Sequence, residues 1–186
     1  GERGAYSMCD EDAMAAAEQY LETSGFAANA SANAIVYGAT LDAYCTVEAL
    51  LARGVGAERI TLVKPAGDAD DAFGDARVAT KVERQLESLG VGVRADLRLC
   101  GLDANSAQVI TTALFEDPDA PPQDGEIPKV MLPCELLLCC GPHRVDRTTF
   151  SAINDNSLVY DGGLVVDAHF RTNDPSVSAA GPVTKF

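Results

Sequence analysis

The sequence has few of the residues that build metal centres or membrane spans. It contains two histidines, His143 and His169, and its six cysteines include no Cys-x-x-Cys pair. A tetrahedral zinc site therefore has no local signature, and we expect no bound metal. No apolar run approaches the ~20 residues that a membrane-spanning helix needs. Even the stretch VMLPCELLLCC contains a proline and a glutamate, so we expect no membrane contact.

Positive charge is also scarce. The chain has 14 Lys and Arg residues against 28 Asp and Glu residues, which gives its 186 residues a net charge of −14. A surface this negative repels phosphate backbones, so we expect no nucleic-acid partner. Apolar residues make up 47% and charged residues 23% of the chain, as in globular proteins of one large or two small domains.

The chain ends and the thiols indicate the setting. The first residues, GERGAYSMCDED, do not begin with methionine and hold no signal-peptide segment, so we expect a non-secreted fragment of a longer polypeptide. Cys134 and Cys139 have the spacing of some redox disulfides. In a strand, however, their Cα atoms lie ~16 Å apart, whereas a disulfide spans at most about 7 Å. Free thiols in a reducing cytoplasmic compartment are the expectation.

Apolar periodicity predicts alternating strands and helices. Helices are expected over 10–22, 41–53 and 76–89. Strands are expected over 34–37, 59–64, 91–99, 108–115, 129–132 and 135–140, with a hairpin over 157–167. This order predicts an α/β fold, specifically a Rossmann-like FAD/NAD(P)-binding domain with a parallel sheet, flanking helices and a β-meander. The domain is expected over 34–186, as an incomplete fragment, after an N-terminal helix and linker at 1–33.

The turn after the strand at 34–37 partly matches the dinucleotide-binding pattern G-x-G-x-x-G/A. Gly38 and Ala43 hold the first and last positions, but Thr40 replaces the central glycine, which lets backbone approach the pyrophosphate. Asp42 adds a carboxylate to the first helical turn, where a phosphate needs the positive end of the helix dipole. The same carboxylate stabilises its own helix. We therefore interpret these positions as vestigial and expect no bound cofactor.

The next strand ends in Lys64-Pro65, where dinucleotide-binding domains carry an acid that binds the ribose hydroxyls. A lysine there favours a 2′-phosphate, so an NADP site stays open as the rival interpretation. The three aspartates that follow it, Asp68, Asp70 and Asp71, weaken that interpretation. Their stretch DADDAF fails the calcium-loop template because Phe73 holds the position that requires glycine.

The C-terminal stretch LVVDAHFRTNDPSVSAAGP resembles the closing signature of flavin-dependent pyridine-nucleotide reductases. In those enzymes a strand ends in Ala-x-Gly-Asp, and the aspartate accepts hydrogen bonds from the flavin ribityl chain. Thr172, Ala179 and Gly181 match this signature in spacing, but Pro182 replaces the aspartate. Proline offers neither a carboxylate nor an N–H group. With Thr40 and Lys64, Pro182 makes the chain look like a pseudo-enzyme.

Other catalytic patterns are missing from the sequence. It contains no G-x-S-x-G, H-E-x-x-H or G-x-x-x-x-G-K-[ST] motif. His143 and His169 are expected in turns or on the surface, since a catalytic base needs a partner that their spacing does not supply. We therefore expect no catalytic residue.

Three segments, VYGATLDAYCTVEALLARGV, RITLVKP and VVDAHFRTNDPSVSAAGPVTKF, together resemble the C-terminal region of the cilia- and flagella-associated protein 61 family. The resemblance runs from about Ala34 to Phe186. It implies a non-catalytic module of the ciliary axoneme, with a reductase-like fold reused as a scaffold. The implied partners are other radial-spoke-base proteins and the calmodulin- and spoke-associated complex, which anchors spokes to doublet microtubules and supports regulation of dynein-driven motility.

Two hypotheses follow. The first is this axonemal module, which we do not expect to contact tubulin directly, because tubulin surfaces are acidic and the chain is too. The second is a flavin- or NADP-dependent oxidoreductase domain whose remaining half lies outside this sequence.

Overall fold

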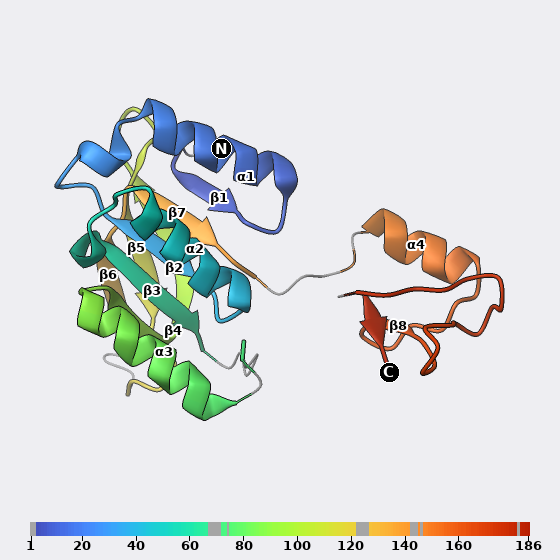
Figure 1. The fold of residues 1–186 in the computed structure, drawn as a ribbon. Coiled ribbons are helices and arrows are strands. Elements are labelled where there is room, and N and C mark those ends of the chain that lie inside the picture. The colour runs from blue at the N-terminus through green and yellow to red at the C-terminus, as the bar shows by residue number, and fades with distance from the viewer. Residues whose placement is uncertain are drawn as a thin grey trace. The chain divides into compact units, whose positions relative to one another are not determined.

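Parallel strands dominate the computed structural model, which describes residues 3–66, 72–73, 75–121, 127–141, 145, 147–181 and 183–186. Within these residues seven strands form one sheet in the order β1-β7-β2-β3-β4-β5-β6 (Figure 1). Their bounds are β1 Ala5–Ser7, β2 Ala34–Tyr37, β3 Ile60–Pro65, β4 Gly92–Ala104, β5 Ile110–Glu116, β6 Lys129–Pro133 and β7 Leu136–Cys139. The five strands β1, β7, β2, β3 and β4 pair in parallel with their neighbours in the sheet. Strands β4, β5 and β6 pair as an antiparallel meander. The predicted α/β class with its meander is confirmed.

Helices α1, α2 and α3 lie within a residue of their predicted bounds, whereas α4 was not predicted. They are α1 Glu11–Thr23, α2 Leu41–Ala52, α3 Ala76–Leu89 and α4 Arg147–Asp155, with short 3₁₀ turns η1 Phe26–Ala28 and η2 Ala57–Arg59. The Asp10 carboxylate caps α1 by accepting from the Ala13 N–H at 2.9 Å, and Asp75 caps α3 through the Arg77 N–H at 2.8 Å. Gly90 ends α3 with φ of 104°, a left-handed conformation that suits glycine.

Two apolar layers cover the two faces of the sheet. On one face, α1, α2 and α3 pack over β2, β3 and β7 (Figure 1), and Val36, Leu62 and Leu138 lie in that layer. On the other face, Ile35 and Leu137 pack with residues of the meander. Because both faces of β2 and β7 are covered, these strands read as continuous apolar runs. No helix among the described residues is long and apolar enough to cross a membrane.

The chain forms two compact units, Gly1–Pro142 and His143–Phe186. The first unit includes the whole N-terminal segment 1–33, whose strand β1 extends the sheet beside β7. The boundary expected between residues 33 and 34 stays a prediction. The second unit contains α4 and a parallel pair of short strands, β8 Leu164–Val165 and β9 Thr184–Lys185.

The hairpin predicted over 157–167 is reduced to one bridge. Tyr160 and Leu164 form a single antiparallel bridge around Asp161-Gly162-Gly163. The second strand of that hairpin then pairs with β9 instead, where the Leu164 N–H donates to the Val183 carbonyl at 2.7 Å. The Asp161-Gly162-Gly163 signal specifies a local reversal of the chain direction. The partner of the following strand depends instead on residues about twenty positions further along the chain.

Candidate functional site

The carboxyl ends of β7, β2 and β3 meet at one edge of the sheet because these strands run parallel and in register. In open α/β sheets, ligands bind outside this edge. The structure brings Gly38, Thr40, Ala43 and Lys64 to it, since Gly38 follows β2 directly and Lys64 lies near the end of β3. The Gly38 N–H donates to the Val63 carbonyl at 3.0 Å and so joins the two strand ends.

Gly38 lies tightly against the end of β7. A Cβ atom at this position would lie 2.1 Å from the Cys140 carbonyl oxygen, closer than any real contact. Cys140, which directly follows β7, is also tied to β2, because its N–H donates to the Tyr37 carbonyl at 2.8 Å. Gly38 therefore fits the first glycine of a dinucleotide-binding turn, whose role is a sharp bend.

The turn continues into α2 through Thr40. Thr40 is the N-cap of α2 and makes no side-chain cap hydrogen bond. Its hydroxyl instead donates to the Cys140 carbonyl at 3.4 Å. Unlike α1 and α3, α2 thus begins without a capping carboxylate. The N-terminus of a helix carries the positive end of the dipole and unpaired N–H groups, which suit a phosphate.

The residues of this turn fit a dinucleotide at two of three positions. Ala43 is fully buried, so its small side chain lets α2 pack closely on the sheet, as the last position of the pattern requires. Gly38 fits the first position by its contact with Cys140. Thr40 departs from the central glycine, but its hydroxyl faces the Cys140 carbonyl rather than the helix N-terminus.

Lys64 is joined to a carboxylate that the sequence does not mark. Its ammonium group donates to Oε1 of Glu83 at 2.7 Å, and the two side chains are 27% and 19% exposed. The Tyr44 hydroxyl on α2 donates to the same oxygen at 3.0 Å. We name these three residues the Glu83 cluster. Glu83 lies on α3 and belongs to no motif, so sequence reasoning had no signal by which to find it.

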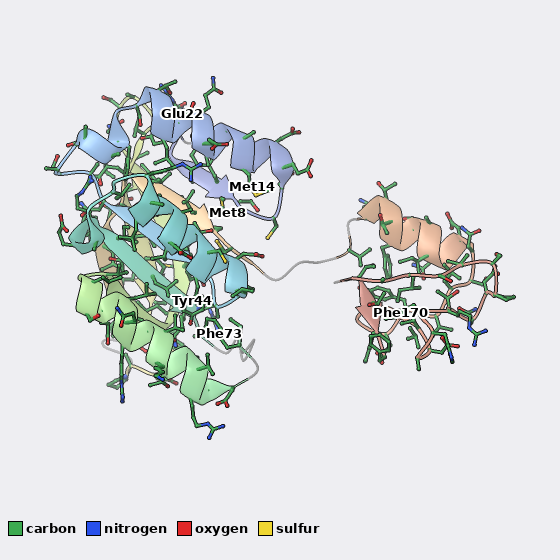
Figure 2. The ribbon with its side chains drawn as sticks, in the orientation of Figure 1. Met8, Met14, Glu22, Tyr44, Phe73 and Phe170 are labelled. Atoms are coloured by element: carbon green, nitrogen blue, oxygen red, sulfur yellow. The ribbon has the colours of Figure 1, made fainter. Side chains whose placement is uncertain are left out.

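An aromatic pair borders the Glu83 cluster. Figure 2 shows the rings of Tyr44 and Phe73 beside each other, with centroids 4.9 Å apart in an edge-on arrangement. Tyr44 is 8% exposed, so its ring belongs to the core while its hydroxyl reaches Glu83. The neighbouring Asp68, Asp70 and Asp71 lie outside the described residues.

An apolar cavity of about 160 Å³ lies between α1, α2 and β7. Met8 and Met14, both labelled in Figure 2, line it together with Leu50 and Leu138. The ion pair between Arg53 and Glu18 also belongs to its lining. Its walls suit side-chain packing, and flexible methionines fill such irregular space well.

Burial makes the three cysteines that flank or end β7 poor nucleophiles. It raises the pKa of Cys134 to about 12 and the pKa of both Cys139 and Cys140 to about 11. All six cysteines are free thiols. In the part of the chain that the structure describes, no group of three or more His, Cys, Asp and Glu side chains could hold a metal ion.

The C-terminal signature lies in the second unit. The Thr172 hydroxyl bonds to the Asp174 and Val177 carbonyls, both at 3.0 Å, so it stabilises a local turn. Gly181 adopts a left-handed conformation with φ of 93°. His169 has a side chain that is 76% exposed and lies 4.0 Å from Asp167. Pro182 and His143 lie outside the described residues.

Comparison with known proteins finds oxidoreductases. No family model matches the chain. Putidaredoxin reductase CamA of Pseudomonas putida is 29% identical over 100 residues, which are 52% of this chain and 20% of that protein. The chain therefore spans about a fifth of the length of this curated relative.

Solved structures agree on the fold. A chain of a covalent putidaredoxin reductase–putidaredoxin complex superposes with a TM-score of 0.70 and 19% identity. The match covers 97% of the present chain and 38% of the matched chain. The ferredoxin reductase for the CYP199A2 system of Rhodopseudomonas palustris has a TM-score of 0.68 and 16% identity. The match covers 99% of the present chain and 39% of the reductase chain. A NAD-dependent persulfide reductase of A. fulgidus has a TM-score of 0.65 and 19% identity. The match covers 98% of the present chain and 30% of the reductase chain. The fold is that of FAD/NAD(P)-binding reductase domains.

The expectation of a non-catalytic, pseudo-enzymatic ciliary module is therefore wrong. Each of the proteins reported above is a reductase. Nothing in these comparisons supports the resemblance to the cilia- and flagella-associated protein 61 family or an axonemal location, and the partners it implied stay a prediction. The pseudo-enzyme expectation rested on three motif positions, Thr40, Lys64 and Pro182, and the ciliary expectation on the resemblance of three sequence segments.

Proposed function

We propose that this chain supplies the pyridine-nucleotide-binding part of a flavin-dependent oxidoreductase. The observation that carries the proposal is the turn from Gly38 to Ala43, which leads from the carboxyl end of a central parallel strand into the uncapped N-terminus of α2. That is where doubly wound folds hold a pyrophosphate. The reductase relatives support the same chemistry.

Each residue of the turn has a separable role in this proposal. The Gly38 backbone fixes the bend against Cys140, and Ala43 holds α2 close to the sheet. The first N–H groups of α2 would face the pyrophosphate, and Asp42 opposes them by lowering the local positive potential. A bound nicotinamide would supply the hydride that such a reductase passes to flavin.

Binding of NADH and NADPH to the purified chain, followed by calorimetry and thermal unfolding, tests the proposal. A nucleotide at 100 times its Kd stabilises the fold by about 2.7 kcal/mol. Replacing Asp42 by Asn removes a negative charge from the first turn, and we expect affinity to rise by about two- to fivefold. Glu48→Gln makes the same charge change on an exposed position of α2 remote from the turn, and we expect it to leave affinity unchanged.

Absence of any thermal shift or heat of binding with both nucleotides at millimolar concentration would refute the proposal. Equal effects of Asp42→Asn and Glu48→Gln would move the bound nucleotide away from the N-terminus of α2.

A further inference from the structure

The Glu83 cluster ties together three elements at the carboxyl edge of the sheet. Lys64 comes from the end of β3, Tyr44 from α2 and Glu83 from α3. Both hydrogen bonds from Lys64 and Tyr44 end on Oε1 of Glu83. The other oxygen, Oε2, accepts no hydrogen bond from a described residue. The carboxylate is thus held firmly on one side, and its side chain keeps 19% of its surface exposed.

This carboxylate contacts the residue at the position where a dinucleotide-binding domain carries its acid. In such domains an acid at the end of the second strand accepts hydrogen bonds from the adenosine ribose hydroxyls. Here that strand, β3, ends in Lys64-Pro65. The Lys64 ammonium group is 2.7 Å from Oε1 of Glu83, so a carboxylate from α3 lies beside the side chain that replaces this acid.

We infer that Glu83 determines which pyridine nucleotide the chain binds and selects NADH over NADPH. The inference rests on the proposed function. Oε2 of Glu83 accepts from the ribose hydroxyls of NADH, while Lys64 and Tyr44 orient the carboxylate through Oε1. These two are positioning residues.

The charges around Lys64 explain the discrimination. A free lysine at the end of β3 would attract the 2′-phosphate of NADPH, but the charge of Lys64 is already compensated by Glu83 at 2.7 Å. A 2′-phosphate would therefore meet a carboxylate of the same sign at close range and with little screening, an arrangement that disfavours binding strongly. It would also draw Lys64 away from Glu83, the carboxylate that Lys64 orients.

Calorimetric titration of the full chain with NADH and with NADPH tests the inference. For the wild type we expect NADH to bind about tenfold more tightly than NADPH, because like charges oppose the 2′-phosphate. Glu83→Gln keeps the shape of the side chain, removes its charge and releases the Lys64 ammonium group. We expect NADPH affinity to rise and NADH affinity to fall, so that the affinity ratio changes by about tenfold or more.

Two further variants make the result specific. Glu87→Gln removes the same charge from an exposed position one turn further along α3, and we expect it to leave the ratio unchanged. Tyr44→Phe keeps the ring against Phe73 but removes the hydroxyl that donates to Glu83. We expect it to weaken NADH binding by a few fold and to leave NADPH binding nearly unchanged. Circular dichroism and thermal unfolding identify any variant that has lost its fold.

The outcomes separate the two proposals. If the wild type binds neither nucleotide, the proposed function fails and this inference fails with it. If both nucleotides bind and Glu83→Gln leaves their affinity ratio unchanged, the proposed function stands and the inference is overturned. Tighter binding of NADPH than NADH by the wild type also overturns it, since Lys64 would then bind the 2′-phosphate in preference to Glu83.

Discussion

At the scale of single residues, burial divides the six thiols into two chemical classes. Cys134 and Cys140 are at most 1% exposed, and Cys139 is half-buried. Taking a thiolate out of water costs free energy, so burial raises the pKa of all three thiols to about 11 or 12. Cys9, Cys45 and Cys100 are exposed. Cys134, Cys139 and Cys140 are therefore poor nucleophiles at neutral pH.

Alkylation with iodoacetamide at pH 8 checks this division. A thiol with a pKa of about 11 is only about 0.1% thiolate at that pH, and the thiolate is the reactive form. We expect Cys9, Cys45 and Cys100 to be labelled quickly in the folded chain, and Cys134, Cys139 and Cys140 only after unfolding. Peptide mass spectrometry over a time course reads each site. Labelling of Cys134 as fast as Cys45 would contradict the assignment.

At the scale of elements, one buried cation organises the path between α1 and β2. Arg59 of η2 is 8% exposed. Its guanidinium donates to the carbonyls of Ala27 at 2.8 Å, Ala32 at 3.1 Å and Phe26 at 3.2 Å, and also to that of Asn29. Four carbonyls outside any strand pairing thus share one planar donor group, which keeps this irregular segment against the core.

Replacing Arg59 by Lys tests this role. An ammonium group keeps the charge but cannot reach several carbonyls at once, so we expect the free energy of unfolding to fall by about 2–3 kcal/mol. Urea denaturation measures the change. Arg53→Lys is the matched control, because Arg53 forms an ion pair with Glu18 and its side chain is 44% exposed. An exposed pair of this kind contributes at most about 1 kcal/mol. Equal losses for the two variants would contradict a structural role of Arg59.

Elements with local signals were predictable, and those without were not. Asp10, Asp75 and Gly90 mark helix ends through contacts within a few residues, so α1 and α3 lie within a residue of their predicted bounds. Strand β1, in contrast, spans only Ala5–Ser7 and pairs with β7, more than a hundred residues along the chain. Helix α4 was missed as well, because a single buried side chain, Ile153, anchors it.

The same limit applies to the candidate site. Gly38 and Ala43 belong to a spacing pattern that the sequence displays, and the structure places both at the strand ends. Glu83 has no such pattern, because its relation to Lys64 depends on how α3 returns over β3. Comparison with the motif identifies the residues that depart from it, Thr40 and Lys64. It does not identify Glu83 as the carboxylate beside Lys64.

At the scale of the whole molecule, net charge and nucleotide binding oppose each other. The chain carries a net charge of −14, and NADH is itself an anion. Long-range repulsion slows their encounter at low salt and is screened over about 8 Å at physiological ionic strength. In the proposed site, the N-terminus of α2 would supply attraction at short range, where screening matters least.

The division into two units predicts where the nucleotide affinity resides. The Gly38 turn, the Glu83 cluster and all strands of the large sheet belong to the first unit, Gly1–Pro142. In the described part of the second unit, the buried apolar side chains are those of Ile153, Leu164 and Val166, and so small a core rarely holds a fold alone. We expect a chain truncated after Gly141 to unfold cooperatively and to keep its NADH affinity, and the isolated segment 143–186 to give the circular dichroism of an unfolded peptide. Loss of NADH binding on truncation, with the sheet intact by circular dichroism, would place essential contacts in the second unit and contradict a site formed by α2, α3 and the strand ends.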